Sequence, residues 1–379
     1  MSRRGRFSDA IIAAVFTVAC IVLWFADFYP NESEKIGEKF PAKVLSVDNS
    51  AIFKVGLLER GEQRLKVEIL SGSRKGQVFD AVNLLRAQMD LDKTFSVGDT
   101  AWVSAEKGAV PEKSTINAQD FYRSSKTLWL FALFSAMLVL FGGFTGVKAL
   151  LSFVFSCLVV WKILVPACLR GGDPIAICLA TVCVLSAAII FLVAGFTKKG
   201  FAAFAGTMLG VLSSCAMAWY FSGSFKVNGA VMPYSQALLY SGYEFLNLTE
   251  LFIGALFLSS SGAVMDLSMD VAAGMAEVAE ANPSLGRRRL LKAGLSIGRS
   301  VVGTMTTTLL LAYSGGYLTL MMAFVANSVE LGDFINNPYV CAEAVKTLVG
   351  SFGLVLVAPF TAIVGCFIFG SGAGRAAVK

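Results

Sequence analysis

The sequence contains no histidine, and this absence removes several kinds of chemistry at once. Zinc sites that need imidazole, hydrolases with a Ser-His pair and proton relays through histidine are all excluded. Any proton transfer would have to use carboxylates, lysine or water. The phosphate-binding sequence Gly-x4-Gly-Lys-[Ser/Thr] is also missing, so ATP drive would have to come from another chain.

Cysteine is missing from the stretch 30–126, where an exported domain would need it for disulfide bonds. The eight cysteines of the chain lie in or next to apolar segments: Cys20, Cys157, Cys168, Cys178, Cys183, Cys215, Cys341 and Cys366. A disulfide framework is therefore not expected. In membrane helices, cysteine most often serves as a small packing residue.

Charged residues make up only 15% of the chain, whereas 56% of the residues are hydrophobic. With a mean hydropathy of +0.68, the chain cannot be an ordinary soluble domain. A membrane-spanning helix takes about 20 predominantly apolar residues. Runs of this kind centre on 9–28, 127–145, 148–168, 174–196, 201–221, 247–265, 300–324 and 345–369. We therefore predict an α-helical polytopic membrane protein with about eight transmembrane helices.

The positions of the basic residues predict the direction of each crossing, because short cytoplasmic loops are enriched in Lys and Arg. An eight-span threading places these basic residues on one side of the membrane: Arg3, Arg4, Arg6, Lys148, Lys198, Lys199, Arg287, Arg288, Arg289, Lys292, Arg299, Arg375 and Lys379. Only Arg170 and Lys226 are left in short outer loops. We expect both termini in the cytoplasm. The net charge of +6 then follows from topology and gives no reason to propose nucleic acid as a partner.

The first apolar segment is preceded by Arg3, Arg4 and Arg6, as in a secretory signal, but no small-x-small cleavage site follows it. Residues 1–29 are therefore predicted to be an N-terminal signal-anchor transmembrane helix. Residues 127–379 would form a seven-helix transmembrane domain with a cytoplasmic loop at about 266–299.

The region 30–126 between them has near-balanced charge and short alternating segments. Alternation in Leu65 to Leu70, and strand-type composition in Thr100 to Val103, suit half-buried strands. We predict a small extracytoplasmic β-barrel-like domain of the OB or SH3 type. No catalytic cluster occurs in it, so capping, assembly or partner binding are its expected roles.

The most informative stretch is the helix that continues the apolar run ending near Val264. Asp266, Asp270, Glu277 and Glu280 share one face of this helix, because residues three, four and seven apart lie on the same side. Carboxylates near a bilayer are expensive and usually face a protein interior, a water-filled cavity or the interface. One interpretation is that the helix leaves the membrane at Asp266 and the acids are solvated. The other is that Asp266 lies on a transport path.

Asp266 and Asp270 are one helical turn apart and could share a cation. Hard oxygen ligands without histidine suit a divalent cation such as Mn²⁺ better than Zn²⁺. The neighbouring Met265 and Met269 point about 100° away on the same helix and are more often packing residues. We therefore name Asp266 and Asp270 as the candidate metal ligands, and we predict no other cofactor.

A second polar stripe follows in the seventh predicted span, where Thr304, Thr307 and Thr308 recur at helical spacing. Their hydroxyls can bond the carbonyl one turn back or join helices, which is the packing interpretation. In the alternative, the three threonines line a hydrophilic path that faces Asp266. The Gly315–Gly316 pair could break this helix, as in the discontinuous helices of transporters.

Two further polar groups lie at or near membrane depth. Lys162 lies within the third predicted span and is expected to snorkel outward, with a buried ion pair as the alternative. Glu343 and Lys346, together with Glu330 and Asp333 of the preceding Asn-rich loop, are predicted at the outer surface. As a cluster they could form an extracellular vestibule.

Three ordered runs, Gly262 to Pro283, Leu291 to Arg299 and Gly303 to Tyr313, together resemble the YibE/F family of bacterial multi-pass membrane proteins. The domain after the first helix makes the chain similar to the YibE type. The resemblance implies the bacterial cytoplasmic membrane and a transport role, with no established substrate or catalytic residue. The partners it suggests are membrane lipid, a small solute or ion, and a second copy or a YibF-like subunit.

The leading functional hypothesis is a transporter or permease for a small solute, not an enzyme. A non-transporting envelope assembly subunit is the alternative, and the lack of a sequence repeat between spans 2–4 and 6–8 favours it slightly. An intramembrane aspartyl protease is the weakest candidate, because no second acid lies in a partner span and no Gly-x-Gly-Asp signal occurs.

Overall fold

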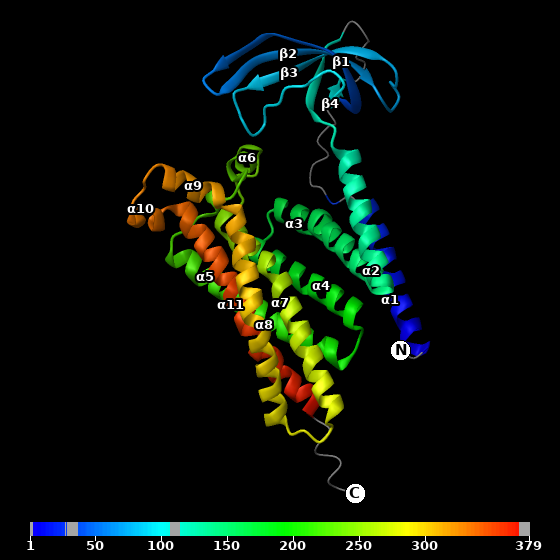
Figure 1. Cartoon of the computed structure of the whole chain (residues 1–379), viewed down its shortest axis with the longest axis vertical. Helices are drawn as coiled ribbons and strands as arrows, with labels where there is room; N and C mark the ends of the chain where they lie inside the picture. The colour runs from blue at the N-terminus through cyan, green and yellow to red at the C-terminus, as the bar shows by residue number, and fades with distance from the viewer. Residues whose placement is uncertain (1–2, 27, 29–36, 107–113, 371–379) are drawn as a thin grey trace. The chain divides into compact units, whose positions relative to one another are not determined.

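A computed structural model describes residues 3–26, 28, 37–106 and 114–370 of the chain (Figure 1). The chain divides into two compact units. One unit spans residues 31–138, and the other consists of residues 1–30 together with 139–379. The first contains all five strands, and the second is helical.

The strands close into a small barrel, as predicted. Their bounds are β1 Glu38–Val55, β2 Leu58–Ile69, β3 Val78–Arg86, β4 Thr100–Ala105 and β5 Ile116–Phe121. The order around the barrel is β1-β2-β3-β5-β4, with every pair antiparallel except β3 and β5. A five-stranded Greek-key closure of this kind is the OB arrangement.

Alternate strand residues fill the barrel core, because successive side chains of a strand point to opposite faces. Val44, Val67, Phe79 and Val103 are among the buried members. Gly61 pairs with Ile52 beside the β1 bulge and has a φ of +126°. A Cβ there would lie 2.1 Å from the carbonyl oxygen of Ala51, so β1 and β2 can lie this close together only because residue 61 is glycine.

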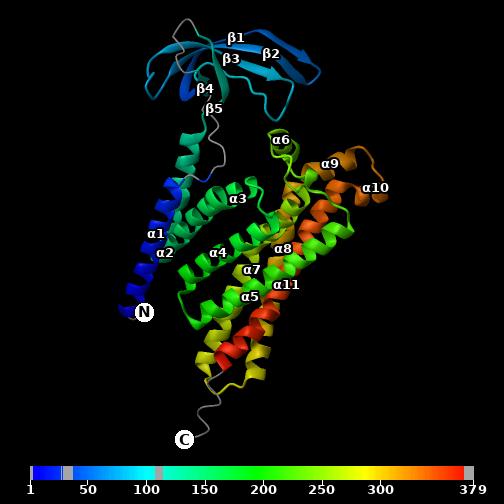
Figure 2. The same ribbon diagram turned by 180° about the vertical axis from the view of Figure 1, so that it is seen from behind.

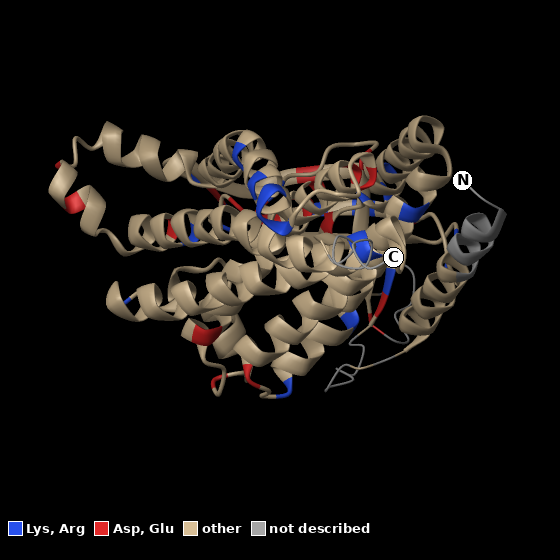
Figure 3. Cartoon of the chain, turned by 90° about the horizontal axis from the view of Figure 1, so that it is seen from below, with Lys and Arg blue, Asp and Glu red and all other residues tan. Residues whose placement is uncertain are grey.

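The helices follow in chain order. Their bounds are α1 Arg3–Phe25, α2 Ser124–Val159, a π-helix Val160–Leu164, α3 Val165–Leu169, α4 Pro174–Ala194, α5 Lys198–Ser224, a 3-10 turn Gly229–Val231, α6 Ser235–Tyr240, α7 Leu248–Ala281, α8 Arg287–Gly316, α9 Leu318–Ala326, α10 Leu331–Asn336 and α11 Pro338–Phe369. α7 packs against α4, α5, α8 and α11, and α11 also packs against α5 and α8 (Figure 2). Most of the helical ribbon carries no charge (Figure 3).

Small residues let α5 and α11 approach closely. A Cβ on Gly206 would lie 2.0 Å from the Thr361 hydroxyl oxygen, and one on Gly353 would lie 1.8 Å from that of Ser214. At the same crossing, Ser268 of α7 donates to the Ala203 carbonyl at 2.6 Å and lies 3.0 Å from Thr361 Oγ1. Such contacts replace the hydrophobic effect as the force that holds membrane helices together.

The described residues contain six helices long and apolar enough to cross a membrane, whereas the sequence predicted eight. The predicted spans 127–145 and 148–168 belong to one helical run, Ser124–Leu169, which is kinked at Gly143. Of the predicted span 9–28, only Ile12–Phe25 is counted, as a shorter apolar helix. Sequence hydropathy could not detect that the chain stays helical between the two apolar runs.

Two further local features lie at the two ends of α8. The stretch 266–299, predicted as a cytoplasmic loop, is helical except for the connection 282–286. The Gly315–Gly316 pair ends α8, and Tyr317, with φ −114° and ψ 16°, separates it from α9. The helix is therefore interrupted where the glycine pair predicted a break.

Candidate functional site

Asp266 and Asp270 lie side by side on α7 and line one cavity of about 360 Å³. Ile189, Ile190 and Val193 of α4, Met265 and Met269 of α7, and Met305 of α8 complete its lining. Both aspartates are exposed, and neither forms an ion pair with a described residue. The cavity thus combines two carboxylates with apolar walls.

The two methionines take part in packing, but they also line the cavity of the aspartates, although helical spacing predicted that they would point about 100° away from them. Met265 is buried against the small residues of α5, and Met269 packs against the same cluster. Among the described residues, no three of Cys, Asp or Glu are grouped so that they could hold a metal ion. A cation at Asp266 and Asp270 would therefore keep water or a solute group as its remaining ligands.

The acidic face of α7 continues into a second cavity of about 660 Å³. Glu277 and Glu280 line it together with Lys198 and Lys199 at the start of α5. No ion pair within 4.0 Å joins these glutamates to the lysines in the described structure. All four acids of the predicted stripe therefore line cavities on one face of α7.

The threonines of α8 do not join this site. Thr304, Thr307 and Thr308 are exposed, and from α8 only Met305 reaches the cavity of Asp266. Their hydroxyls donate to the carbonyls of Val301, Gly303 and Thr304, at 2.9, 3.0 and 3.0 Å. The hydroxyls are thus satisfied within their own helix, and the structure leaves the threonine stripe apart from Asp266.

Lys162 is buried in the π-helix that joins α2 to α3, and its Nζ lies 4.9 Å from the ring centroid of Trp161. The outward snorkelling predicted for it does not occur. Lys148, assigned by the threading to a cytoplasmic loop, is also buried, with Nζ 5.5 Å from the Phe144 ring centroid. Cation–π contacts of this kind favour a charged group beside an aromatic face.

A polar cluster between α7, α8 and α11 contains Glu343 and Lys346, which the sequence grouped, and adds Tyr313 and Ser259, which it did not. Glu343 and Lys346 form an ion pair at 3.5 Å, and Lys346 Nζ lies 5.3 Å from the ring centroid of Tyr313. Tyr313 in turn lies 3.2 Å from the Ser259 hydroxyl. The i,i+3 spacing indicates the ion pair, but nothing in the sequence places α8 beside it.

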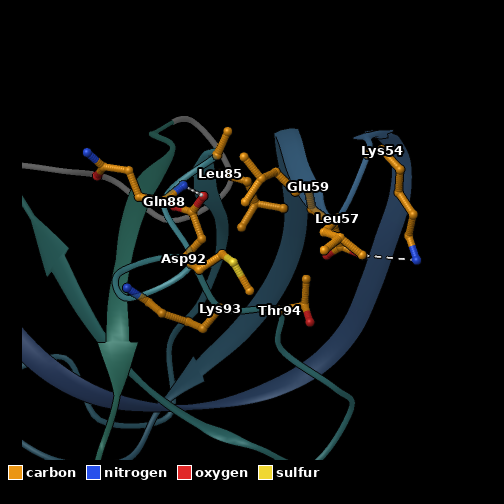
Figure 4. A pocket seen from close by; sticks show the side chains of 12 residues that line it. Lys54, Leu57, Glu59, Leu85, Gln88, Asp92, Lys93 and Thr94 are labelled. Carbon is orange, nitrogen blue, oxygen red and sulfur yellow. Dashed lines mark hydrogen bonds and ion pairs between the residues drawn. The ribbon is translucent and has the colours of Figure 1, made fainter. Parts of the chain in front are cut away.

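The barrel has a cavity of its own, about 330 Å³, between the β1–β2 turn and the loop after β3 (Figure 4). Asp92 closes this loop by accepting hydrogen bonds from the backbone N–H groups of Arg86 and Gln88, at 2.8 to 3.0 Å. Partial desolvation acts to raise the pKa of Asp92, but these hydrogen bonds outweigh it and the pKa is lowered. Lys54 and Glu59 pair at the rim of the cavity, 3.5 Å apart.

These features define an α-helical membrane protein that carries a five-stranded barrel and an acid-lined face on one long helix. A family model described as YibE/F-like protein matches residues 130–371, so the chain belongs to the YibE/F family. The match covers the helical region from α2 onward and leaves α1 and the barrel outside. Comparison with curated proteins and with solved structures found no match.

Proposed function

We propose that this protein is a secondary transporter or permease for a small solute, and that Asp266 and Asp270 bind the cation or proton that moves with it. The observation that carries the proposal is that two carboxylates without an ion-pair partner line a cavity walled by apolar side chains. Acids at such a position are costly, and in membrane helices they mark ion and proton paths.

The acidic side chains of α7 favour a cation as the bound ion. Every charged side chain that α7 contributes to the two cavities is acidic, from Asp266 to Glu280. The carboxylates of Asp266 and Asp270 project from positions about 6 Å apart along the helix. A hydrated divalent cation such as Mn²⁺ accepts two carboxylate oxygens and completes its shell with water.

In the proposed topology, the protein crosses the bacterial cytoplasmic membrane eight times, with both termini inside. The run Ser124–Leu169 has 46 residues, or about 69 Å at 1.5 Å per residue, more than twice the roughly 30 Å of a hydrocarbon core. Gly143, with φ 54° and ψ −131°, supplies a non-helical point at which this run divides into two spans. With α1 as an anchor, the count reaches eight.

The proposal is tested by reconstituting the full chain in liposomes and measuring Mn²⁺ uptake and proton-coupled flux. Asp266→Asn should abolish transport without reducing the amount of protein in the membrane. Glu330→Gln, which removes an exposed acid outside both cavities, is the matched control and should transport like the parent. Equal transport by the parent and Asp266→Asn would overturn the role of the pair.

A scaffold or assembly role remains the second candidate, and the exposure of α8 favours it. Gly303, Thr304, Thr307 and Thr308 form a small and polar face that no described residue covers. Small residues permit the close approach of another helix, so a second copy or a YibF-like subunit could pack on this face. Disulfide cross-linking of a Thr307→Cys variant in membranes would detect a second copy, with Ser224→Cys, at an exposed position at the end of α5, as the control.

A further inference from the structure

A cavity of about 430 Å³ lies where α8 is interrupted, at the other end of α7 from the acidic residues. Its walls come from α7, the α8–α9 break, the start of α11 and the segment around Pro233. Most of the lining is apolar: Val231, Met232, Pro233, Phe252, Leu256 and Leu320. The polar side chains come from Ser259, Tyr317, Tyr339, Glu343 and Lys346. Ligand sites typically combine a mostly apolar lining with a few convergent polar groups.

Tyr313 does not line the cavity itself, but it connects α7, α8 and α11 through the lining residues Ser259 and Lys346. Its hydroxyl lies 3.2 Å from Ser259 Oγ of α7, which also donates to the Leu256 carbonyl at 2.8 Å. The Tyr313 hydroxyl therefore donates to Ser259 and keeps an acceptor lone pair free. Gly350 of α11 lies beside the ring, since a Cβ there would be 3.4 Å from Tyr313, about van der Waals contact.

The charges of the cavity balance. Glu343 Oε2 lies 3.5 Å from Lys346 Nζ, is shielded from solvent and accepts no hydrogen bond from a described residue. Lys346 has the Tyr313 ring on another side. One acceptor and one ammonium group are therefore held close together beside apolar walls, and an unsatisfied buried oxygen of this kind favours a donor.

This balance discriminates among ligand classes. A metal cation would bind one carboxylate and be repelled by Lys346, and an anion would be repelled by Glu343. A neutral apolar molecule would offer no donor to Glu343 Oε2, which accepts no hydrogen bond from a described residue. A zwitterion satisfies both, because its ammonium group can donate to Glu343 Oε2 while its carboxylate accepts from Lys346.

We propose that this cavity binds a small zwitterion with an apolar side group, the chemical class of the free α-amino acids. Val231, Phe252 and Leu256 enclose the side group, and the charged pair holds the two ionised ends. The proposal deepens the transporter function by naming the class of solute, but it rests on this cavity alone. Binding can be measured without any gradient, so its failure and the failure of transport are distinguishable.

The test is equilibrium binding of radiolabelled leucine to the full-length protein purified in detergent. Two analogues of the same apolar body serve as competitors: 4-methylpentanoate lacks the ammonium group, and 3-methylbutylamine lacks the carboxylate. Leucine should bind saturably, and each analogue should compete at least tenfold more weakly. Absence of saturable leucine binding, or competition by either analogue equal to that of leucine, overturns the proposal.

Single-residue variants test whether leucine binds in this cavity. Glu343→Gln and Lys346→Met should each weaken leucine binding at least tenfold, and Tyr313→Phe should weaken it by a smaller factor. Glu330→Gln removes an exposed acid outside the cavity and should bind like the parent. Asp266→Asn should abolish transport yet keep leucine binding. Thermal unfolding midpoints within a few degrees of the parent verify that the variants fold, and unchanged binding by both charge variants overturns the site.

Discussion

The side chains of Gln63 and Asn83 are hydrogen-bonded to each other inside the barrel, where Asn83 Nδ2 donates to Gln63 Oε1 at 3.1 Å. Gln63 is fully buried, and its Nε2 donates to Asn49 Oδ1 and to the Phe95 carbonyl, at 2.8 and 2.9 Å. Its Oε1 also accepts from the Phe95 N–H at 2.9 Å, while Asn83 donates to the Lys93 carbonyl at 2.6 Å. Two amides thus fasten the connection before β4 onto β2 and β3.

Gln63→Leu should destabilise the barrel by about 2 kcal/mol or more, because it leaves the buried N–H and carbonyl of Phe95 and the amide of Asn83 without their partner. Urea unfolding of the separately expressed fragment 31–138 measures the effect. Gln119→Leu is the matched control, since the Gln119 side chain is exposed on β5 and forms no hydrogen bond with a described residue. A similar loss in both variants would contradict the role of the buried network.

The stability of the barrel should fall in acid because of Asp92. Its pKa is lowered in the folded state, so its contribution is fully present above the unfolded-state value of about 3.9. The contribution is lost as the pH falls through the lower folded-state pKa. Urea unfolding of the fragment from pH 7 to pH 2 should show this loss, and Asp92→Asn should remove that part of the pH dependence. Asp80→Asn, which changes an exposed carboxylate that accepts no hydrogen bond within the described part of the chain, should keep the parent profile.

The close approach of α5 and α11 should not tolerate a side chain at Gly206. Gly206→Ala places a methyl group 2.0 Å from Thr361 Oγ1 and 2.9 Å from its Cα, which should cost about 1–3 kcal/mol. The thermal unfolding midpoint of the purified protein in detergent should drop by several degrees. Gly223→Ala on the same helix meets open space and should leave the midpoint unchanged. Combining Gly206→Ala with Thr361→Ala should recover part of the loss.

Position along the acidic stripe should decide how much each carboxylate matters for transport. Glu277 lies seven residues beyond Asp270, nearer the connection to α8, in the wider cavity that also contains Lys198 and Lys199. A solvated acid there should contribute under about 1 kcal/mol, whereas a cation-binding acid in a poorly hydrated site contributes several. Flux in liposomes should therefore be nearly unchanged in Glu277→Gln and absent in Asp266→Asn. If both variants transport like the parent, the acidic stripe is a solvated helix face.

The orientation predicts the accessibility of two serines. Ser50 of β1 should be labelled from outside the cell, and Ser284, in the connection between α7 and α8, only from inside. Single cysteines at these positions, introduced after the native cysteines are replaced by alanine, can be probed with a membrane-impermeant maleimide. Labelling of Ser284→Cys in intact cells would reverse the proposed topology.

Much of the architecture could be predicted from local patterns. Apolar runs located all six long helices, and short alternating segments located the barrel, because both patterns depend on neighbours within one element. The hydropathy pattern alone could not establish the predicted number of eight membrane-spanning helices, because the helical conformation continues from Ser124 to Leu169 across a kink at a glycine. Hydropathy measures composition and does not register where a helix bends.

The candidate site, too, could be predicted from the sequence only in part. Helical spacing put Asp266 and Asp270 on one face of α7, and the structure keeps them together at a cavity. Spacing also grouped Thr304, Thr307 and Thr308, but it could not specify what that face of α8 contacts. Contacts between helices depend on crossing angles and on which small residues allow close approach, and neither is encoded in one helix alone.

The sequence by itself determined the helical membrane class, the separate barrel region and the acidic face of α7, because these follow from hydropathy and periodicity along the chain. Only the tertiary structure decided that the threonines stay apart from Asp266, that Lys162 is buried, and that Tyr313 joins Ser259 to the Glu343–Lys346 pair. Those relations link residues far apart in sequence, and they arise from the packing of α4, α7, α8 and α11 against one another.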